Sequence, residues 1–344
     1  MTIPEYIHFS NDPLATLSKV LSTAKADKVA LLLDENTQSM CLPILGLFKA
    51  DLIIEIVSGE KHKTLDSCQI IWRKLTEAGF SRKSILVNLG GGVIGDMGGF
   101  CASTFKRGIR FINIPTTLLA AVDANIGGKL GIDFMGFKNH IGVFNNPMAV
   151  IVSDQFLKTL PKRELRSGYA EVIKHGLIAD KKYWDGLLDC TFPNLDWQNV
   201  IRHSIGIKGS VVAEDPLENG KRKILNFGHT LGHAVETYYL NHQKSLLHGE
   251  AIACGMILEA HISYQQSLVS EQILDEICKH ILSVYEKITL PALQELNDIM
   301  IHDKKNVGST INFSLINNLG SCLYDQQVDE KSIIEAIKYY ENIK

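Results

Sequence analysis

The sequence lacks long apolar runs, and it lacks an excess of charge of either sign. Its 344 residues carry 35 lysines and arginines against 38 aspartates and glutamates, a formal net charge of −3. No apolar segment is long enough to span a bilayer, and the first residues form neither a basic nor an apolar stretch, so no membrane partner and no secretory leader are expected. The near-neutral charge argues against nucleic acid as a partner, so the basic residues are expected to anchor a small anionic ligand.

Paired cysteines are also missing. The seven cysteines are scattered and include no C-x-x-C pair. An odd number of unpaired thiols fits a reducing compartment better than a disulfide framework or a thiolate metal site. The sequence therefore predicts a cytoplasmic protein. Its composition, 45% hydrophobic and 21% charged, is that of a globular chain long enough for two cores.

Short β-branched runs alternate with helical stretches in the first half of the chain. The expected strands cover residues 29–34, 53–57, 85–89, 109–114 and 150–152. This rhythm predicts an α/β, Rossmann-like N-terminal domain with a mainly parallel sheet, assigned to residues 1–155. From Pro161 to about residue 301 the pattern is that of amphipathic helices, and residues 310–315 and 321–324 resemble a hairpin. Residues 156–344 are therefore expected to form a mostly α-helical C-terminal domain.

A glycine-rich turn follows the expected strand 85–89. Gly90, Gly92 and Gly95 form a G-x-G-x-x-G pattern that leads into a helix. Such a turn lets backbone N–H groups approach a pyrophosphate, although tight packing of a helix on a sheet explains the same glycines. No acidic residue follows about 20 positions later, so Asp34 and Asn36 at the end of the first expected strand are the predicted ribose or adenine contacts. The turn 59–63, Gly-Glu-Lys-His-Lys, ends the second expected strand at the same sheet edge.

Polar residues recur at helical spacing in the segment 222–236. If the segment is one helix, its polar stripe contains Arg222, Asn226, His229, His233 and Glu236. Two histidines at i and i+4 can share a metal ion, and a catalytic zinc takes about three protein ligands with one open position. The nearby segments 248–250, His-Gly-Glu, and 168–175 supply a carboxylate and further imidazoles.

Several lysines and arginines are candidates for holding a doubly anionic substrate. For any one of them alone, a solvated surface charge is the alternative explanation. The connection 115–139 is rich in glycine and polar residues and is expected to be a functional loop. The candidate cations are Arg107, Lys129, Lys174, Lys208, Arg222 and Lys304.

In this order, the segments 90–96, 115–129, 226–233 and 248–250 resemble the 3-dehydroquinate synthase family across essentially the whole chain. The resemblance implies a dehydroquinate synthase-like fold, a homodimer and two cofactors, NAD and one divalent metal ion, with zinc or cobalt as the candidates. It implies metal ligation by Glu171, His229 and His248. Arg107 matches an arginine that the family presents across the dimer interface.

The resemblance also implies two further sets of site residues. The substrate and catalytic set is Arg107, Asp123, Lys129, Asn139, Glu171, Lys174, Lys208, Arg222, Asn226, His233 and Lys304, with Lys305 as the alternative to Lys304. The NAD set is Asp34, Asn36, Glu60, Lys63, Gly91, Gly92, Val93, Asp96, Thr116, Thr117, Asp123, Lys129 and Lys138. Leu130 and Asp133 stand where the family commonly has Thr and Asn, on the expected nicotinamide side.

The implied reaction converts 3-deoxy-D-arabino-heptulosonate 7-phosphate to 3-dehydroquinate and phosphate, a step of aromatic amino acid biosynthesis by the shikimate pathway. NAD would accept a hydride and return it, with phosphate elimination and an intramolecular aldol closure between. The alternatives are a metal-dependent NAD(P) alcohol or polyol dehydrogenase, another sugar phosphate cyclase, and a non-catalytic binding protein. A zincin is excluded because Thr230 stands where H-E-x-x-H needs Glu.

Overall fold

The computed structural model describes residues 1–242, 244, 246–301 and 311–343. The chain divides into two compact units, one of residues 1–165 and 197–205 and one of residues 166–196 and 206–344. The chain passes from one unit to the other within α6 (Lys162–Ala179), directly before α8 (Trp197–Glu214), and again within α8. Within the described residues no helix is both long and apolar enough to cross a membrane.

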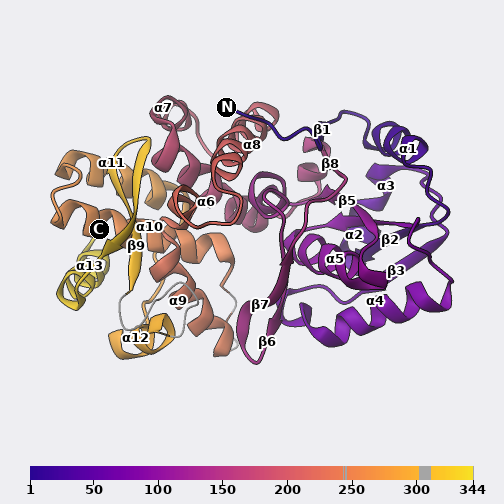
Figure 1. Cartoon of the computed structure of the whole chain (residues 1–344). Helices are drawn as coiled ribbons and strands as arrows, with labels where there is room; N and C mark the ends of the chain where they lie inside the picture. The colour runs from indigo at the N-terminus through magenta and orange to yellow at the C-terminus, as the bar shows by residue number, and fades with distance from the viewer. Residues whose placement is uncertain (243, 245, 302–310, 344) are drawn as a thin grey trace. The chain divides into compact units, whose positions relative to one another are not determined.

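The first unit is built on one sheet of six parallel strands (Figure 1). The predicted α/β architecture is confirmed, and a short N-terminal strand that the sequence did not suggest joins one edge. In spatial order the strands are β1 (Ile7–Phe9), β8 (Ala149–Val152), β5 (Arg110–Pro115), β4 (Ile85–Gly90), β2 (Val29–Asp34) and β3 (Leu52–Ile56).

Alternation along the strands divides the apolar side chains between two cores. In β2, Leu31 and Leu33 face one core, whereas Ala30 and Leu32 face the other. This alternation is the period of two expected for strands covered on both faces. The first core is covered by α1 (Pro13–Ala24) and α3 (Leu42–Leu45), and the second by α4 (Leu65–Glu77) and α5 (Gly92–Thr104). The short helix α2 (Glu35–Met40) follows β2 directly.

The expected functional loop 115–139 is largely regular structure. It contains a π-helical turn, Ala120–Ala124, and then enters the antiparallel hairpin of β6 (Lys129–Phe134) and β7 (Phe137–Phe144). The expectation of a loop was wrong for residues 129–139, because Leu130 and Ile132 of β6 pack into the core beneath α4 and α5 and hold the hairpin there.

The second unit is mostly helical, as predicted. Its C-terminal hairpin is confirmed, with strands β9 (Asn312–Asn318) and β10 (Ser321–Gln327). The helices that lie wholly in this unit are α7 (Lys181–Leu188), α9 (His229–Asn241), α10 (His248–Gln265), α11 (Glu271–Val284), α12 (Leu293–Ile301) and α13 (Glu330–Asn342).

Candidate active site

The segment 222–236 is not the single helix that its spacing predicts. A 3-10 helix covers Lys221–Asn226, and α9 begins at His229. Phe227 and Gly228 between them are not helical. Gly228 has φ +77°, a left-handed conformation that favours glycine, and a Cβ there would lie 2.5 Å from Met256 Cγ on α10. Close packing against α10 therefore interrupts the helix.

Glycines bring helices α6, α9 and α10 together at their functional residues. A Cβ on Gly255 of α10 would collide with the carbonyl oxygen of Gly228, and one on Gly249 would collide with that of Ser167 on α6. The Gly249 N–H also donates to Ser167 Oγ at 3.0 Å. These close approaches place the beginning of α9 against the middle of α10, and the beginning of α10 against α6.

The three predicted metal ligands, Glu171, His229 and His248, meet where α6, α9 and α10 pack together. Glu171 Oε1 lies 3.4 Å from His229 Nε2 and 3.5 Å from His248 Nε2. Ligand atoms bound tetrahedrally to zinc at about 2.0–2.1 Å are about 3.3–3.4 Å apart, so both separations suit two edges of such a site. Glu171 is fully buried, and its Oε1 receives no hydrogen bond from any residue that the structure describes. A buried carboxylate oxygen in that state fits a metal ligand.

The other nitrogen of each imidazole is held by the protein. His229 Nδ1 is 3.0 Å from the carbonyl oxygen of Phe227, and His248 Nδ1 is 3.3 Å from Glu236 Oε2. A partner at Nδ1 fixes the ring and directs Nε2 toward the metal position, as is usual around protein-bound zinc. Glu236 was recognised in the polar stripe but not given this role, because its contact with His248 crosses between two helices.

His233 offers a fourth group near the same point. One ligand atom each from His229, His233 and His248 all lie within 4.8 Å of one another. The ring centroids of His229 and His233 are 4.9 Å apart. His233 is half-buried, whereas His229 is buried. The prediction that His233 faces substrate is not tested by this geometry.

Charges at the junction shift the pKa values in opposite directions. Burial would raise the pKa of Glu171, but the Lys174 ammonium and the neighbouring imidazole of His229 hold it well below its usual range. Burial and the Lys174 charge lower the pKa of His229 to about 4. Burial alone would also lower the pKa of His248, but the carboxylates of Glu236 and Glu171 outweigh it and raise the pKa to about 9. Glu171 is thus an anion and His229 is neutral, the forms that bind a metal, whereas His248 carries a proton that a metal ion would have to displace.

A buried glutamate that the sequence analysis missed caps helix α9, which begins with His229. Glu259 of α10 is fully buried, and its two carboxylate oxygens accept from the N–H groups of Gly228 at 2.6 Å and Leu231 at 3.1 Å. The N-cap residue Gly228 has no side chain to do this. A carboxylate there satisfies two unpaired N–H groups and interacts favourably with the helix dipole.

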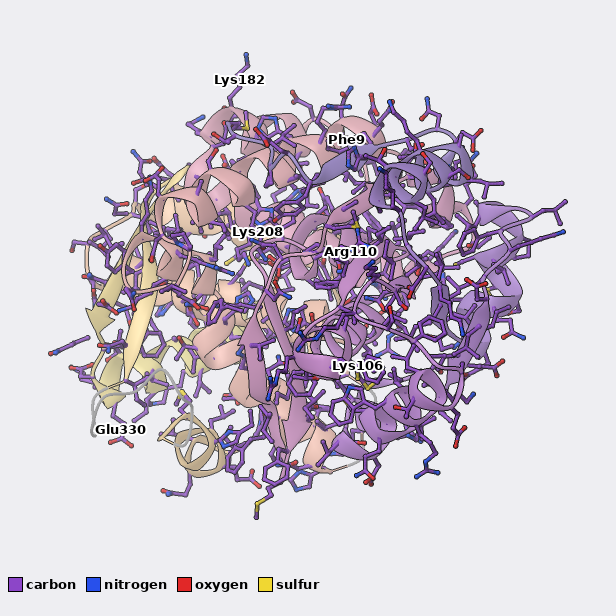
Figure 2. The ribbon with its side chains drawn as sticks, turned by 45° about the vertical axis from the view of Figure 1, so that its right-hand side comes forward. Phe9, Lys106, Arg110, Lys182, Lys208 and Glu330 are labelled. Carbon is purple, nitrogen blue, oxygen red and sulfur yellow. The ribbon has the colours of Figure 1, made fainter. Side chains whose placement is uncertain are left out.

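Three of the candidate cations of the second unit are buried rather than solvated. Lys174, Lys208 and Arg222 are 1%, 6% and 2% exposed, whereas Lys182 points away from the fold in Figure 2. Lys174 Nζ contacts Glu171 Oε2, and Arg222 Nη1 donates to the carbonyl oxygen of Pro216 at 2.5 Å. Burial therefore rules out, for these three side chains, the solvated surface charge that is the alternative explanation of a lone cation.

Asn226 lies on the same segment as Arg222. Its Nδ2 donates to Glu218 Oε1 at 2.8 Å. Lys304 lies outside the described residues.

The predicted phosphate loop has the expected form in the first unit. Helix α5 begins at Gly92, and its N-cap residue Gly91 supplies no side-chain hydrogen bond to the first turn. Val93 follows in that first turn, which contains no acidic residue. A Cβ on Gly91 would lie 3.1 Å from Thr117 Cγ2, so glycine keeps the backbone approachable. An uncapped, glycine-lined helix N-terminus fits a pyrophosphate.

Other predicted cofactor residues form a charged cluster in the same unit. Lys63 is 3% exposed, and its Nζ lies 2.6 Å from Asp96 Oδ2 and 2.7 Å from Asn139 Oδ1. Lys138 Nζ is 3.4 Å from Glu60 Oε1. The structure therefore joins residues from the turn 59–63, α5 and β7 that are far apart in the sequence.

The remaining predicted residues of the first unit lie on turns at strand ends. Asp34 caps α2 by accepting from the Thr37 N–H at 2.8 Å, and Asn36 is exposed on that helix. Thr116 is buried directly after β5, while Thr117 Oγ1 accepts from the Ala120 N–H at 3.1 Å and begins the turn that contains Asp123. Lys129 is exposed at the start of β6.

The two departures from the family motif have different surroundings. Leu130 is 7% exposed in the core and fills the space left by Gly99, so its side chain packs against α5. Asp133 Oδ1 accepts from the Asn139 N–H at 2.7 Å, and burial raises the pKa of Asp133. Leu130 is thus explained by packing, and Asp133 by the turn it stabilises.

Arg107 is exposed in an unusual backbone segment. Lys106, Arg107 and Gly108 have φ values of +51°, +69° and +110°. Consecutive left-handed residues other than glycine are costly and concentrate at functional sites.

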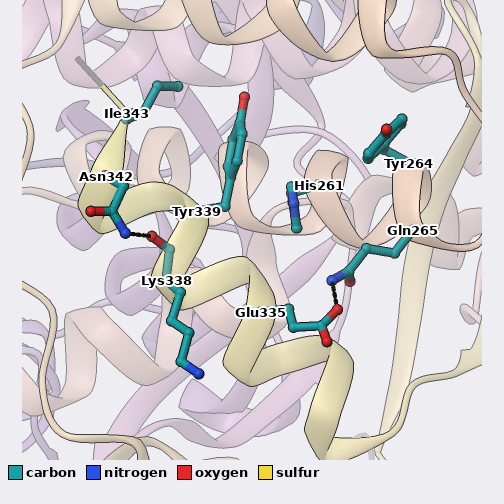
Figure 3. Close-up of a pocket in the computed structure, with 8 residues that line it drawn as sticks. All are labelled: His261, Tyr264, Gln265, Glu335, Lys338, Tyr339, Asn342 and Ile343. Carbon is teal, nitrogen blue, oxygen red and sulfur yellow. Dashed lines mark hydrogen bonds between the residues drawn. The ribbon is translucent and has the colours of Figure 1, made fainter.

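A surface groove on the second unit lies elsewhere. It is lined by α10 and α13, and the His261 ring stacks on Tyr339 with centroids 4.3 Å apart (Figure 3). None of the predicted site residues lines it. The groove therefore adds nothing to the assigned chemistry.

The chain matches two family models, 3-dehydroquinate synthase N-terminal over residues 53–167 and 3-dehydroquinate synthase C-terminal over residues 168–306. It is 41% identical over 337 residues to a 3-dehydroquinate synthase of Parabacteroides distasonis, covering 96% of each chain. The chain belongs to the 3-dehydroquinate synthase family.

Solved structures agree with that assignment. A 2-deoxy-scyllo-inosose synthase complexed with carbaglucose-6-phosphate, NAD+ and Co2+ has a TM-score of 0.85 at 26% identity, over 97% of this chain and 96% of that one. An iron-containing alcohol dehydrogenase of Corynebacterium glutamicum has a TM-score of 0.70 at 13% identity, over 99% and 95%. The second likeness shows the fold alone, so membership of the 3-dehydroquinate synthase family favours the cyclase over the dehydrogenase.

Proposed function

We propose that the protein converts 3-deoxy-D-arabino-heptulosonate 7-phosphate to 3-dehydroquinate and inorganic phosphate. Family membership supports the reaction. The structural observation that carries it is Glu171 Oε1, which is buried, receives no hydrogen bond from the described residues, and lies 3.4 and 3.5 Å from two imidazole nitrogens beside Lys174. An open metal site next to a buried ammonium suits a substrate with a hydroxyl and an anionic group.

Two binding functions are assigned to the two parts of the chain. Residues 1–155 are proposed to bind NAD, because they contain the uncapped N-terminus of α5 and the charged cluster around Lys63. Residues 156–344 are proposed to bind substrate and a divalent ion held by Glu171, His229 and His248. When bound, the ion supplies polarisation of a substrate hydroxyl, and NAD supplies reversible hydride acceptance.

The chain's own cations bind and orient the substrate in this proposal. The side chains of Lys174, Lys208 and Arg222 are buried. Water therefore screens the attraction between their charges and an anionic substrate less than it does at the surface. Arg222 can offer a carboxylate two parallel N–H bonds, and lysines hold phosphate as point charges. Orientation of this kind can lower a barrier by several kcal/mol, on the order of 7–11 at best.

The other polar groups complete the substrate set. His233 is assigned proton transfer at an imidazole nitrogen, since it lies one turn after His229 and is half-buried. Asn226 is assigned a neutral substrate contact. Asp123, Lys129 and Asn139 of the first unit are assigned further contacts, and Lys304 keeps the role that the family motif gives it.

A homodimer and a cytoplasmic location complete the proposal. The exposed, left-handed Arg107 supports an arginine presented to a second copy of the chain. All seven cysteines lie in the described part of the chain and are free, which supports a reducing compartment.

The deciding experiment measures phosphate release from the heptulosonate phosphate with NAD and a divalent ion added or withheld. Phosphate release that needs both, with no net NADH, is the expected result, because the hydride is returned within each turnover. Stoichiometric NADH would instead support the dehydrogenase, and no release at all would refute the proposed reaction.

A further inference from the structure

Three buried asparagines of the first unit form a continuous chain of hydrogen bonds. Asn88 of β4 and Asn113 of β5 are neighbours in the strand register. Asn88 Nδ2 donates to Asn113 Oδ1 at 2.8 Å, and Asn113 Nδ2 donates to Asn125 Oδ1 at 2.5 Å. We call Asn88, Asn113 and Asn125 the amide chain.

The amide chain ends on the π-helical turn that carries Asp123. Asn125 Nδ2 donates to the carbonyl oxygen of Ala120 at 3.0 Å, and the Asn125 backbone N–H contacts the same oxygen at 3.3 Å. Both bonds close the turn Ala120–Ala124. Single π-helical turns are rare and occur frequently at functional sites, and this turn bears a residue assigned to the substrate.

Two glycines of α5 leave space for the amide chain. A Cβ on Gly95 would lie 2.7 Å from Asn125 Oδ1, and one on Gly98 would collide with Asn88 Oδ1. Gly95 is the third glycine of the phosphate-loop pattern. The asparagines thus lie between the sheet and the helix that begins at the predicted phosphate loop.

The neighbouring residues on the same face of the sheet are apolar. Asn88 and Asn113 point to the same face of the sheet as Leu86 and Phe111, which belong to the core under α5. Asn88 and Asn113 are 1% and 2% exposed, and within the described part of the chain Asn88 Oδ1 receives no hydrogen bond. Apolar residues would fill these positions without an unsatisfied oxygen, so burial alone does not account for two asparagines.

We propose that the amide chain positions Asp123 for the reaction by holding the π-helical turn in one conformation. Each amide plane is oriented by its neighbour, and the last one fixes the carbonyl oxygen of Ala120, three residues before Asp123. Asn88, Asn113 and Asn125 are therefore positioning residues that do not touch substrate. The inference rests on the role of Asp123 in the proposed function.

Hydrogen exchange tests, without any assay of activity, whether the amide chain holds the π-helical turn in one conformation. In Asn125→Ala and in Asn113→Leu, exchange of the backbone amides in 120–126 should become at least tenfold faster than in the wild type. This increase is measured relative to any change in the strands of the sheet. Asn145→Ala is the matched control, since Asn145 is exposed next to the same hairpin and its side-chain Nδ2 donates at the surface, to Ser103 Oγ at 2.9 Å. Unchanged exchange in the first two variants would overturn the proposal.

Kinetics test whether the amide chain positions Asp123 for the reaction. The loss of kcat should be largest in Asn125→Ala, smaller in Asn113→Ala and smallest in Asn88→Ala, following the order along the chain toward Asp123. If the asparagines only stabilised the fold, the loss of kcat would instead follow how deeply each one is buried. The greatest losses would then come from Asn88→Ala and Asn113→Ala. Asn125→Ser, which retains a donor and an acceptor, should recover part of the loss even if Asn125→Ala folds poorly.

A double-mutant cycle with Asp123 closes the test. Asn125→Ala should lower kcat at least tenfold in the wild-type background and less than twofold in an Asp123→Asn background, because its effect passes through Asp123. Equal losses in both backgrounds would overturn the positioning role, and so would wild-type kcat in Asp123→Asn. A wild-type protein that releases no phosphate would instead refute the proposed function, whatever the exchange experiment shows.

Discussion

The buried carboxylate of Glu259 gives the most direct test of how the metal site is built. Its two oxygens accept from the N–H groups of Gly228 and Leu231, at the beginning of the helix that carries His229. In Glu259→Gln one oxygen is replaced by an NH2 group, which cannot accept, and the charge is lost. One N–H group is then buried without an acceptor.

The expected loss of stability follows from these two contacts. A hydrogen bond to an ionised group contributes about 1.5–3 kcal/mol, and a buried donor without a partner costs about 1–3 kcal/mol. We therefore expect Glu259→Gln to destabilise the second unit by about 3 kcal/mol. For a unit of this size about 2–4 °C of melting temperature is lost per kcal/mol, which predicts a shift of about 6–12 °C.

Metal binding should weaken together with stability. Displacement of the first turn of α9 moves His229 away from Glu171, so the Kd for a divalent ion should rise about 10–100-fold, the range for residues that orient metal ligands. Calorimetric melting of the metal-free protein and metal titration measure the two effects separately. Glu335→Gln is the control, because Glu335 is exposed on α13 and accepts from Gln265 Nε2, and it should change stability by no more than about 0.5 kcal/mol. Unchanged melting and metal affinity in Glu259→Gln would refute the reasoning.

Three further predictions concern the assigned ligands and cations. His229→Ala should reduce the metal content from about one ion per chain to none by elemental analysis, and an unchanged content would remove His229 from the metal site. Arg222→Lys should lower kcat/KM at least tenfold although the charge is retained, because an ammonium cannot make two parallel bonds to a carboxylate, whereas wild-type kinetics would place Arg222 outside the site. Mixed Arg107→Ala and Lys129→Ala chains, each inactive alone, should regain activity in heterodimers in which one site carries neither change. No recovery after demonstrated subunit exchange would argue that Arg107 does not act across a dimer interface.

Local patterns in the sequence were sufficient for much of the fold. The strand β2 was predicted at residues 29–34, where the structure has it, because alternating apolar residues cover both faces of a parallel sheet. The helix beginning after the glycine-rich turn was predicted for a similar reason, since glycine and the start of a helix are adjacent in the chain. Glu171, His229 and His248 were chosen by resemblance, and the structure brings them together, while their role in metal binding stays a prediction.

The tertiary structure alone decided the features that depend on contacts between distant residues. The break at Gly228 arises because α10 approaches its backbone, and the cap on α9 comes from Glu259, 31 residues later. The amide chain likewise connects Asn88 to Asn113 across two strands. The spacing of apolar residues in the sequence predicts which face of a helix or strand is buried. It does not predict which side chain of another helix or strand lies opposite that face. Packing makes that choice, and it determines where a buried polar group finds its partner.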